Sequence, residues 1–313
     1  MQPIIQDNQD IIALIWDFDK TLIPEYSQKP LFEEYKIDEK AFWRECNAQK
    51  EAYERLDARI NPDTYYLNHL LSYVEAGLMP GLTLDKLLEI GGRIKFFPGL
   101  PDFFEEIKTD IETRFSQHEV KVEHYLVSTG MRELIKGSGI APFVKDIWSC
   151  ELLQHKFDKK TGTIKEYDNI VDIGYTLDNT SKTRAIFEIN KGVNVHKELN
   201  VNQTMPEEDR RIPVANMIYI ADGPSDVPAF SVVKKGGGRT LAVFKEGDAN
   251  SFAQAKSMLD EQRVHYFSKA DYRKDSTTHQ WIMASANEIA ERIVAIKKVR
   301  LNKGRAGVPG HLS

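Results

Sequence analysis

The sequence has little cysteine and no long apolar run, and both absences are informative. Only two of its 313 residues are cysteine, and Cys46 and Cys150 lie far apart with no CxxC spacing. This predicts unpaired, buried thiols in a reducing compartment. No apolar run approaches the roughly 20 residues that cross a bilayer, and residues 1–10 lack the basic and apolar regions of a signal peptide. We therefore expect a cytoplasmic protein with no membrane partner.

An excess of basic residues and the common nucleotide-binding loops are also missing. The net charge is −5, so the chain lacks the basic footprint of a dedicated nucleic-acid binder. No GxGxxG or GxxxxGKS/T spacing occurs, and the glycine run at 236–238 therefore predicts a connector. With 41% hydrophobic and 28% charged residues, the chain has the composition of an ordinary globular protein with a sizeable core. Composition leaves monomer and homodimer both open.

The most informative stretch is an apolar run that leads directly into two carboxylates. Six apolar residues, 11–16, precede Asp17 and Asp19. Such a run is typical of a strand covered on both faces in a parallel sheet, and ligands of open parallel sheets bind outside the carboxyl ends of the strands. Side chains two positions apart can point the same way, so these carboxylates would repel each other without a cation or a shared proton. The pattern predicts a metal site.

The pattern changes after Pro24, which indicates a second structural unit. Residues 25–95 carry apolar and aromatic residues at helical spacing, interrupted by Pro and Gly. The Pro- and Gly-containing stretch 96–101 marks the return to the first unit. We predict a core of residues 1–24 and 96–313, with residues 25–95 inserted as a helical cap.

The remaining chain alternates predicted strands and helices. Strands are expected at 120–127, 147–153, 217–221, 241–244 and 264–267, and a hairpin at 157–164. Helices are expected at 102–115, 131–136, 181–190, 227–235, 251–259 and 278–299. The polar stretch 192–211 predicts a loop, and 300–313 predicts a frayed tail.

Two groups along this part of the chain could bind an anion. Ser128, Thr129 and Gly130 stand between a predicted strand and a predicted helix, where backbone N–H groups and the helix dipole favour phosphate. A plain helix N-cap explains the same residues. Lys182 opens the helix expected at 181–190, on the side of the helix dipole that disfavours a cation. It is either solvated or reaches across to an anion.

A second strand delivers carboxylates in the same way as the first. The apolar run 217–221 ends at Asp222, and Gly223, Pro224 and Asp226 lead into the next predicted helix. Gly223 permits a tight turn or a close backbone approach. An ordinary turn with an Asp cap is the alternative, but it does not explain why the aspartates follow another buried-strand pattern.

In this order, the four motifs resemble those of the haloacid dehalogenase superfamily of phosphohydrolases. The resemblance covers about residues 11–244 and is most similar to the phosphoserine phosphatase-like branch, which carries a helical cap after its first motif. It implies an α/β fold, with a Rossmann-like three-layer α/β/α core, a parallel sheet and a helical cap. Ala221, where relatives carry Gly, and Pro224 depart from the pattern, but neither removes a ligand.

The resemblance also implies a chemistry, that of a Mg²⁺-dependent phosphatase acting on a small phosphomonoester through an aspartyl-phosphate. Asp17 would be the nucleophile, and Asp19 the general acid and then the base. Ser128, Thr129, Gly130 and Lys182 would bind the phosphate. Asp17, Asp19 through its backbone carbonyl, Asp222 and Asp226 would hold the Mg²⁺, with Asp226 in the inner or the outer shell.

Other functions remain open at this point. A catalytically silent phosphate-binding or regulatory protein could keep the fold, and a phosphotransferase or phosphonatase is a lesser alternative. The substrate is not specified by the motifs and depends on the cap. Candidates to face the site are Glu25, Arg44, Arg55 and Arg59, although each could equally be solvated surface. The aromatic residues Trp43, Tyr53, Tyr65 and Tyr66 are expected to form the core of the cap.

Overall fold

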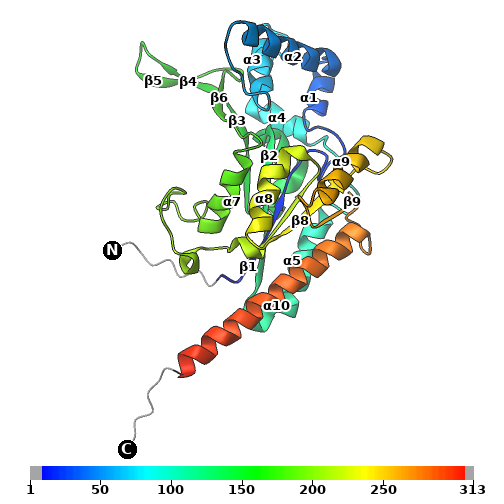
Figure 1. The fold of residues 1–313 in the computed structure, drawn as a ribbon. Coiled ribbons are helices and arrows are strands. Elements are labelled where there is room, and N and C mark those ends of the chain that lie inside the picture. The colour runs from blue at the N-terminus through cyan, green and yellow to red at the C-terminus, as the bar shows by residue number, and fades with distance from the viewer. Residues whose placement is uncertain (1–8, 307–313) are drawn as a thin grey trace, which may run out of the picture.

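The structure, a computed structural model, describes residues 9–306 and contains a seven-stranded sheet with helices around it (Figure 1). The strands are β1 Ile11–Trp16, β2 Lys121–Met131, β3 Asp146–Leu153, β4 His155–Asp158, β5 Thr163–Glu166, β6 Asp172–Tyr175, β7 Met217–Ala221, β8 Arg239–Phe244 and β9 Tyr266–Lys269. The helices are α1 Lys29–Glu34, α2 Glu39–Arg55, α3 Tyr65–Glu75, α4 Leu84–Gly91, α5 Asp102–Arg114, α6 Arg132–Ile135, α7 Lys182–Lys191, α8 Val227–Lys235, α9 Ala249–Asp260 and α10 Thr277–Ala306.

The sheet has the strand order β6-β3-β2-β1-β7-β8-β9, with β1 at its centre. In the part of the sheet with the order β3-β2-β1-β7-β8-β9, all neighbouring strands run parallel, as the apolar patterns predict. The edge strand β6 pairs antiparallel with β3, so the sheet is mixed and not purely parallel. β6 has four residues, none of them fully buried, which explains why no apolar run marks it in the sequence.

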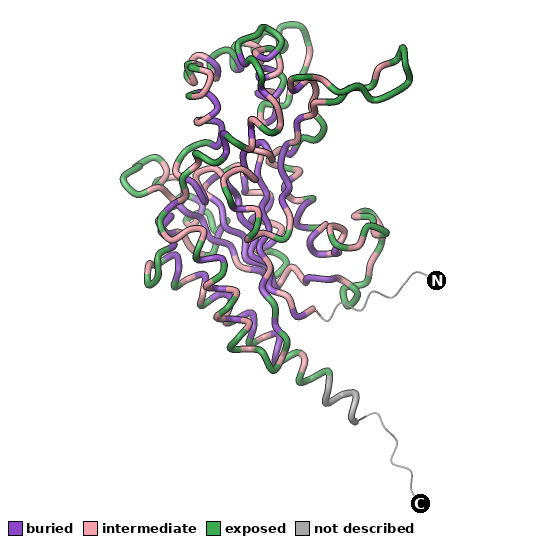
Figure 2. The backbone as a smooth tube through the Cα atoms, turned by 180° about the vertical axis from the view of Figure 1, so that it is seen from behind, coloured by how far each residue is buried: buried purple, intermediate pink, exposed green. Residues whose placement is uncertain are grey.

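Side chains alternate along β1 to build two separate cores. Ile12, Leu14 and Trp16 pack on one face of the sheet with α5 and α10. Ala13 and Ile15 pack on the other face, in the cluster that includes α7, α8 and α9. All five residues are fully buried, and Figure 2 shows the buried strands at the centre of the molecule. The three-layer α/β/α prediction is confirmed.

Helices α1–α4 lie beyond the carboxyl ends of the strands, at the top of Figure 1. Helix α4 packs closely on α6 and the turn that follows it, since a Cβ on Gly137 would stand only 2.0 Å from the carbonyl oxygen of Leu88. A Cβ on Gly91 would likewise stand only 2.3 Å from the carbonyl oxygen of Leu134. The segment 25–95 is thus helical, and its division from the rest as a cap domain stays a prediction.

The exposed hairpin β4–β5 projects from the same end of the molecule, where Figures 1 and 2 show it standing clear of the sheet. Its register pairs Phe157 with Ile164, and Gly162 adopts a φ of 70° in the turn, as the hairpin prediction requires.

Both cysteines are free and buried, as predicted. Among the residues that the structure describes, none of the helices is both long and apolar enough to cross a membrane.

The largest boundary errors are at the ends of β2 and α10. β2 runs through Ser128, Thr129 and Gly130 to Met131, so the helix begins at Arg132. The pairing of β2 with β3 shifts register between Val127 and Met131, which places these residues in an irregular part of a strand and not at a helix N-terminus. Helix α10 continues to Ala306, beyond the start of the predicted frayed tail, while residues 307–313 of that tail lie outside the described residues.

Candidate active site

Asp17 and Asp222 emerge side by side because their strands are neighbours. β1 and β7 pair in parallel, with Trp16 opposite Ile220. The backbone N–H of Asp17 continues this ladder by donating to the carbonyl oxygen of Ile220 over 3.0 Å. The carboxylates that follow the two apolar runs therefore lie at the same edge of the sheet. The side chain of Asp17 is almost completely buried there.

Lys182 joins the motifs at this edge. Its ammonium nitrogen lies 2.8 Å from Oδ1 of Asp17 and 2.8 Å from Oδ1 of Asp226. The residue is only 1% exposed, which excludes the solvated alternative. Helix α7 brings Lys182 inward at its first residue, and Ala185, Ile186 and Ile189 on the same helix pack into the core beneath it.

Asp226 is fixed more tightly than its position in a turn suggested. Its carboxylate accepts hydrogen bonds from the Tyr219 hydroxyl over 2.6 Å and the Ser225 hydroxyl over 2.8 Å, besides the bond from Lys182. Sequence reasoning missed Tyr219, which the apolar pattern of β7 marks only as a buried residue. A tyrosine within a fully buried strand needs a hydrogen-bond partner for its hydroxyl, and that requirement was the available signal.

Burial and mutual repulsion shift the proton affinities of this cluster. Burial raises the pKa of Asp17 well above its usual range, the charge of Lys182 opposes this, and Asp226 and Asp222 add to it. Burial and the charge of Asp226 raise the pKa of Asp222 to about 7. Burial alone would lower the pKa of Lys182, but the carboxylates of Asp17 and Asp226 raise it overall. One buried ammonium group therefore only partly offsets these carboxylates.

The chemistry of the donor set fits a divalent cation. Carboxylate oxygens of Asp17, Asp222 and Asp226 lie within 4.8 Å of one another, and hard cations such as Mg²⁺ prefer such oxygen ligands. Asp226 already accepts three hydrogen bonds. This favours Asp17 and Asp222 as direct ligands and leaves the inner or outer position of Asp226 open.

Asp19 faces a different set of partners. Ser27 donates its backbone N–H to Oδ1 of Asp19 over 2.8 Å and its hydroxyl to Oδ2 over 3.3 Å. Burial raises the pKa of Asp19 to about 6, although both bonds from Ser27 lower it. A carboxyl group with this pKa is present in both protonation states near neutral pH. Ser27 is completely buried and was not identified from the sequence.

The Ser128–Gly130 segment approaches Asp19 from β2. A Cβ on Gly130 would stand 2.9 Å from Oγ of Ser27 and 3.7 Å from Oδ2 of Asp19, so only glycine fits without a shift. The hydroxyl oxygen of Ser128 accepts the N–H of Gly130 over 3.0 Å, which leaves the hydroxyl hydrogen available to an anion. Thr129 presents its carbonyl oxygen to the Tyr66 hydroxyl of α3, 2.9 Å away. The predicted anion-binding residues are therefore beside the predicted general acid.

The four charged residues that were candidates to face the site do not contact its catalytic carboxylates. Glu25 forms an ion pair with Lys245 over 2.7 Å. Arg55 lies 3.7 Å from Glu51 on the surface, and Arg59 is exposed. Within the described chain, no hydrogen bond or ion pair joins any of these residues or Arg44 to Asp17 or Asp19.

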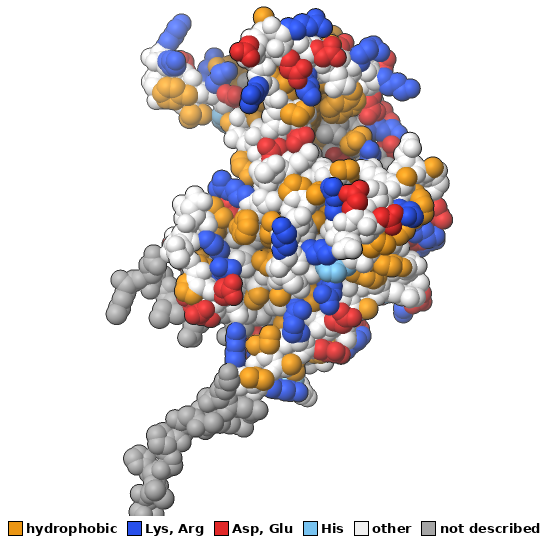
Figure 3. Space-filling model, viewed as in Figure 1, with side chains coloured by type: hydrophobic (Ala, Val, Ile, Leu, Met, Phe, Trp, Pro, Cys, Tyr) orange, Lys and Arg blue, Asp and Glu red, His pale blue; other side chains and the backbone are white. Residues whose placement is uncertain are grey.

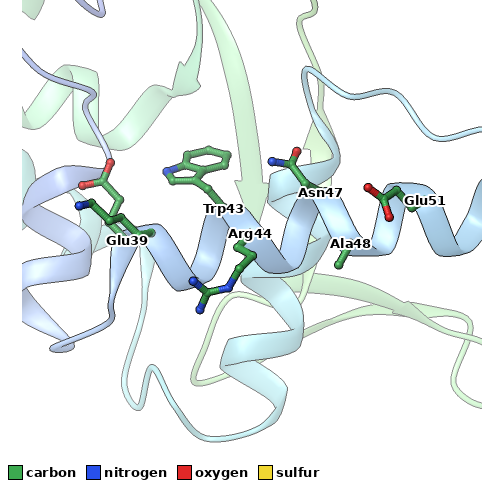
Figure 4. Close-up of a pocket in the computed structure, with 7 residues that line it drawn as sticks. Glu39, Trp43, Arg44, Asn47, Ala48 and Glu51 are labelled. Carbon is green, nitrogen blue, oxygen red and sulfur yellow. The ribbon is translucent and has the colours of Figure 1, made fainter.

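Arg44 lines a groove of about 680 Å³ along one face of α2. The residues that line it are Glu39, Lys40, Trp43, Arg44, Asn47, Ala48 and Glu51. Figure 4 shows Trp43, Arg44 and Asn47 projecting from α2. The ring of Trp43 lies 5.7 Å from that of Tyr66, the residue that contacts Thr129. Trp43 and Tyr66 thus belong to the packed interior of α1–α3, whereas Tyr53 is 40% exposed.

Comparison with known proteins identifies a relative that covers most of the chain. No family model matches the sequence. An uncharacterized protein of Borreliella burgdorferi is 36% identical over 287 residues, which cover 89% of this chain and 98% of that protein.

Solved structures with a similar fold include a HAD-family hydrolase from Salmonella enterica serovar Typhi. It shows a TM-score of 0.49 and 14% identity, over 82% of this chain and 66% of the hydrolase. A phosphoserine phosphatase carrying a phospho-aspartyl intermediate analogue shows a TM-score of 0.47 and 16% identity, over 84% of this chain and 96% of that one. The chain belongs to the same family as the Borreliella burgdorferi protein.

Proposed function

We propose that this protein is a Mg²⁺-dependent phosphatase that hydrolyses a small phosphomonoester through an aspartyl-phosphate on Asp17. The observation that carries the proposal is the placement of two carboxyl groups with different partners. Asp17 lies against the buried ammonium group of Lys182, whereas Asp19 is held by Ser27 and has a pKa of about 6. A site that only binds phosphate has no need of a nucleophile beside a proton donor.

In the first step, an oxygen of Asp17 attacks phosphorus, and the bond from phosphorus to the ester oxygen breaks. Protonated Asp19 donates its proton to that departing oxygen, so the leaving group is released as a neutral alcohol. The ammonium group of Lys182 stabilises the negative charge shared by Asp17 and the phosphoryl group. Thr21 donates its hydroxyl to Oδ2 of Asp17 over 3.1 Å and orients the carboxylate.

In the second step, water replaces Asp17 on phosphorus. Asp19, now ionised, takes a proton from the water as its oxygen attacks, and the bond from phosphorus to Asp17 breaks. This restores both carboxyl groups and releases inorganic phosphate. The hydroxyl of Ser128 and the nearby backbone would hold phosphoryl oxygens during both steps. Mg²⁺, held by Asp17 and Asp222, would supply positive charge that offsets the charge of the phosphoryl oxygens.

The proposal is tested by phosphate release from a panel of small phosphomonoesters, with Mg²⁺ and with a chelator. The panel should include phosphorylated amino acids, phosphorylated alcohols and nucleoside monophosphates. We expect turnover that requires the metal and falls by at least about 10³-fold in Asp17→Asn, because the covalent route is lost. Lys29→Gln, an exposed change on α1, is the matched control. A folded wild-type protein that binds Mg²⁺ but releases no phosphate would refute the proposal and favour a phosphate-binding role.

A further inference from the structure

Residues 19–27 form a short loop that closes on itself beside the candidate active site. At its base, Ser27 donates to the carboxylate of Asp19. Inside the loop, the ammonium nitrogen of Lys20 lies 2.8 Å from the Tyr26 hydroxyl and 4.0 Å from the centre of the Tyr26 ring. Tyr26 is 44% exposed. Lys20 therefore directly follows the predicted general acid in the chain and, unlike the buried Lys182, is partly accessible to solvent.

The backbone at Lys20 does not favour a lysine. Its φ is 59°, in the left-handed region where a side chain is disfavoured and glycine is not. Strained backbone persists where the surrounding structure fixes it, and such positions cluster at functional sites. Glycine would form the same turn more easily, so the local conformation gives no reason for a lysine at this position.

The charges around Lys20 supply a reason. Lys182 is buried, and its ammonium group is already engaged by Asp17 and Asp226. Lys20 is half-buried, and no carboxylate oxygen of the described residues lies within ion-pair distance of its ammonium group. An ordinary lysine is cationic at neutral pH, and Asp19 and Asp222 are within electrostatic reach of the ammonium group of Lys20.

We propose that Lys20 is a substrate-recognition residue whose ammonium group binds an oxygen of the phosphate dianion as it enters the site. The inference rests on the phosphatase function proposed above. It gives the active site a second cationic residue besides the buried Lys182, one that is partly exposed to solvent. An incoming phosphomonoester meets a cluster rich in carboxylates, and a single buried lysine offsets only part of their repulsion. The contact from Lys20 is a charge-assisted hydrogen bond, made in exchange for its bond to Tyr26.

The test uses the full-length protein with Mg²⁺ and three substitutions, Lys20→Gly, Lys20→Gln and Lys20→Arg. We expect kcat/KM to fall about 10- to 100-fold in the Gly and Gln variants, as for the loss of one hydrogen bond to a charged group. Lys20→Arg should keep most of the activity because it keeps the charge. The thermal midpoint of Lys20→Gly should equal or exceed that of the wild type, since glycine suits the backbone. Lys29→Gln serves as the matched surface-lysine control.

Binding of inorganic phosphate, measured by calorimetry, gives a readout that does not depend on turnover. Phosphate affinity should fall in Lys20→Gln by a factor similar to that in kcat/KM. If the wild type turns over and both quantities are unchanged in Lys20→Gly and Lys20→Gln, the role of Lys20 is refuted while the phosphatase function stands. If the wild type binds phosphate through Lys20 but hydrolyses no ester, the recognition role stands and the phosphatase function fails. A wild type that neither binds phosphate nor turns over refutes both.

Discussion

The ammonium nitrogen of Lys182 lies 2.8 Å from Oδ1 of Asp17, although 165 residues separate them in the chain. This contact joins the first residue of α7 to the residue that follows β1, and the same ammonium group also contacts Asp226. Three motifs that are separate in the sequence thus share one ion-pair network. Both carboxylates and the lysine are almost completely buried, so the network is poorly screened by solvent.

Loss of Lys182 should destabilise the fold. Lys182→Met leaves buried carboxylates without their counter-ion, which typically costs about 3–5 kcal/mol. We expect that loss in the free energy of unfolding, measured with urea in the absence of metal, and partial recovery when Mg²⁺ is added. Arg184→Met, an exposed change on the same helix, should cost no more than about 1 kcal/mol. Equal effects of the two substitutions would contradict the buried network.

Neutralising Asp17 should have the opposite effect on stability. Asp17→Asn removes one of several mutually repelling carboxylates, while Lys182 keeps its contact with Asp226. In metal-free buffer the thermal midpoint should therefore be unchanged or higher by a few degrees, about what a gain of 1 kcal/mol gives. Differential scanning calorimetry measures this directly. A large fall in the midpoint would show that Asp17 stabilises the fold more than it repels its neighbours.

Mg²⁺ should stabilise the protein through Asp222. A ligand present at about 100 times its dissociation constant adds about 2.7 kcal/mol to the free energy of unfolding. We expect a rise in the thermal midpoint with Mg²⁺ that is lost on chelation and strongly reduced in Asp222→Asn. Asp260→Asn, on the exposed end of α9, is the control and should leave the rise intact. An unchanged response in Asp222→Asn would exclude that residue as a ligand.

A buried histidine predicts acid sensitivity. His124 accepts the indole N–H of Trp16 at Nδ1 over 3.1 Å, and its Nε2 lies 3.1 Å from the Phe104 carbonyl oxygen, so the neutral ring is satisfied at both nitrogens. Burial lowers the pKa of His124 from 6.5 to about 3. Between these values the unfolded chain binds a proton that the folded protein does not, so stability is lost as the pH falls below 6.5.

The size of this effect can be isolated with His124→Gln. Each pH unit below 6.5 costs up to about 1.4 kcal/mol, so His124 can account for at most about 3 kcal/mol lost between about pH 7 and pH 4. Urea unfolding at both pH values should show a smaller pH-dependent loss in His124→Gln, because glutamine does not take up a proton. Carboxylates contribute to the acid sensitivity of the wild type and of His124→Gln alike. The difference between the two proteins in pH-dependent loss of stability therefore reports on His124. If the two pH dependences are identical, His124 is not the sensitive group.

Gly130 and Ser27 should behave as a coupled pair. Gly130→Ala places a methyl group 2.9 Å from Oγ of Ser27, so this hydroxyl must move and lose its hydrogen bond to Oδ2 of Asp19. We expect kcat to fall about 10- to 100-fold, as for misplaced acid–base chemistry. In the background of Ser27→Ala, which lacks that hydroxyl, Gly130→Ala should have a smaller additional effect. Additive effects on kcat in the double-mutant cycle would contradict the coupling.

Periodicity and local spacing were sufficient to predict most of the elements. The run 11–16 matches β1 at both ends, and 217–221 matches β7, because a strand buried on both faces must be continuously apolar. β6 was missed because a short, half-buried edge strand has no such constraint. The helix expected at Met131 starts one residue later because β2 bulges through Ser128–Gly130 to stay paired with β3.

The sequence by itself determined which residue types the site contains and in what order, since the two apolar runs had to end in Asp17 and Asp222 at the same edge of a parallel sheet. Local spacing alone left Lys182 undecided between solvent and an anion until the resemblance implied that it binds phosphate, and the roles of Ser27 and Tyr219 were not identified. Only the tertiary structure decided these, because a hydrogen-bond partner from another element is set by packing in three dimensions and leaves no periodic trace in the chain. The same holds for Gly130. Only the tertiary structure explains the glycine there, because Oγ of Ser27 lies 2.9 Å from the point where a Cβ would stand.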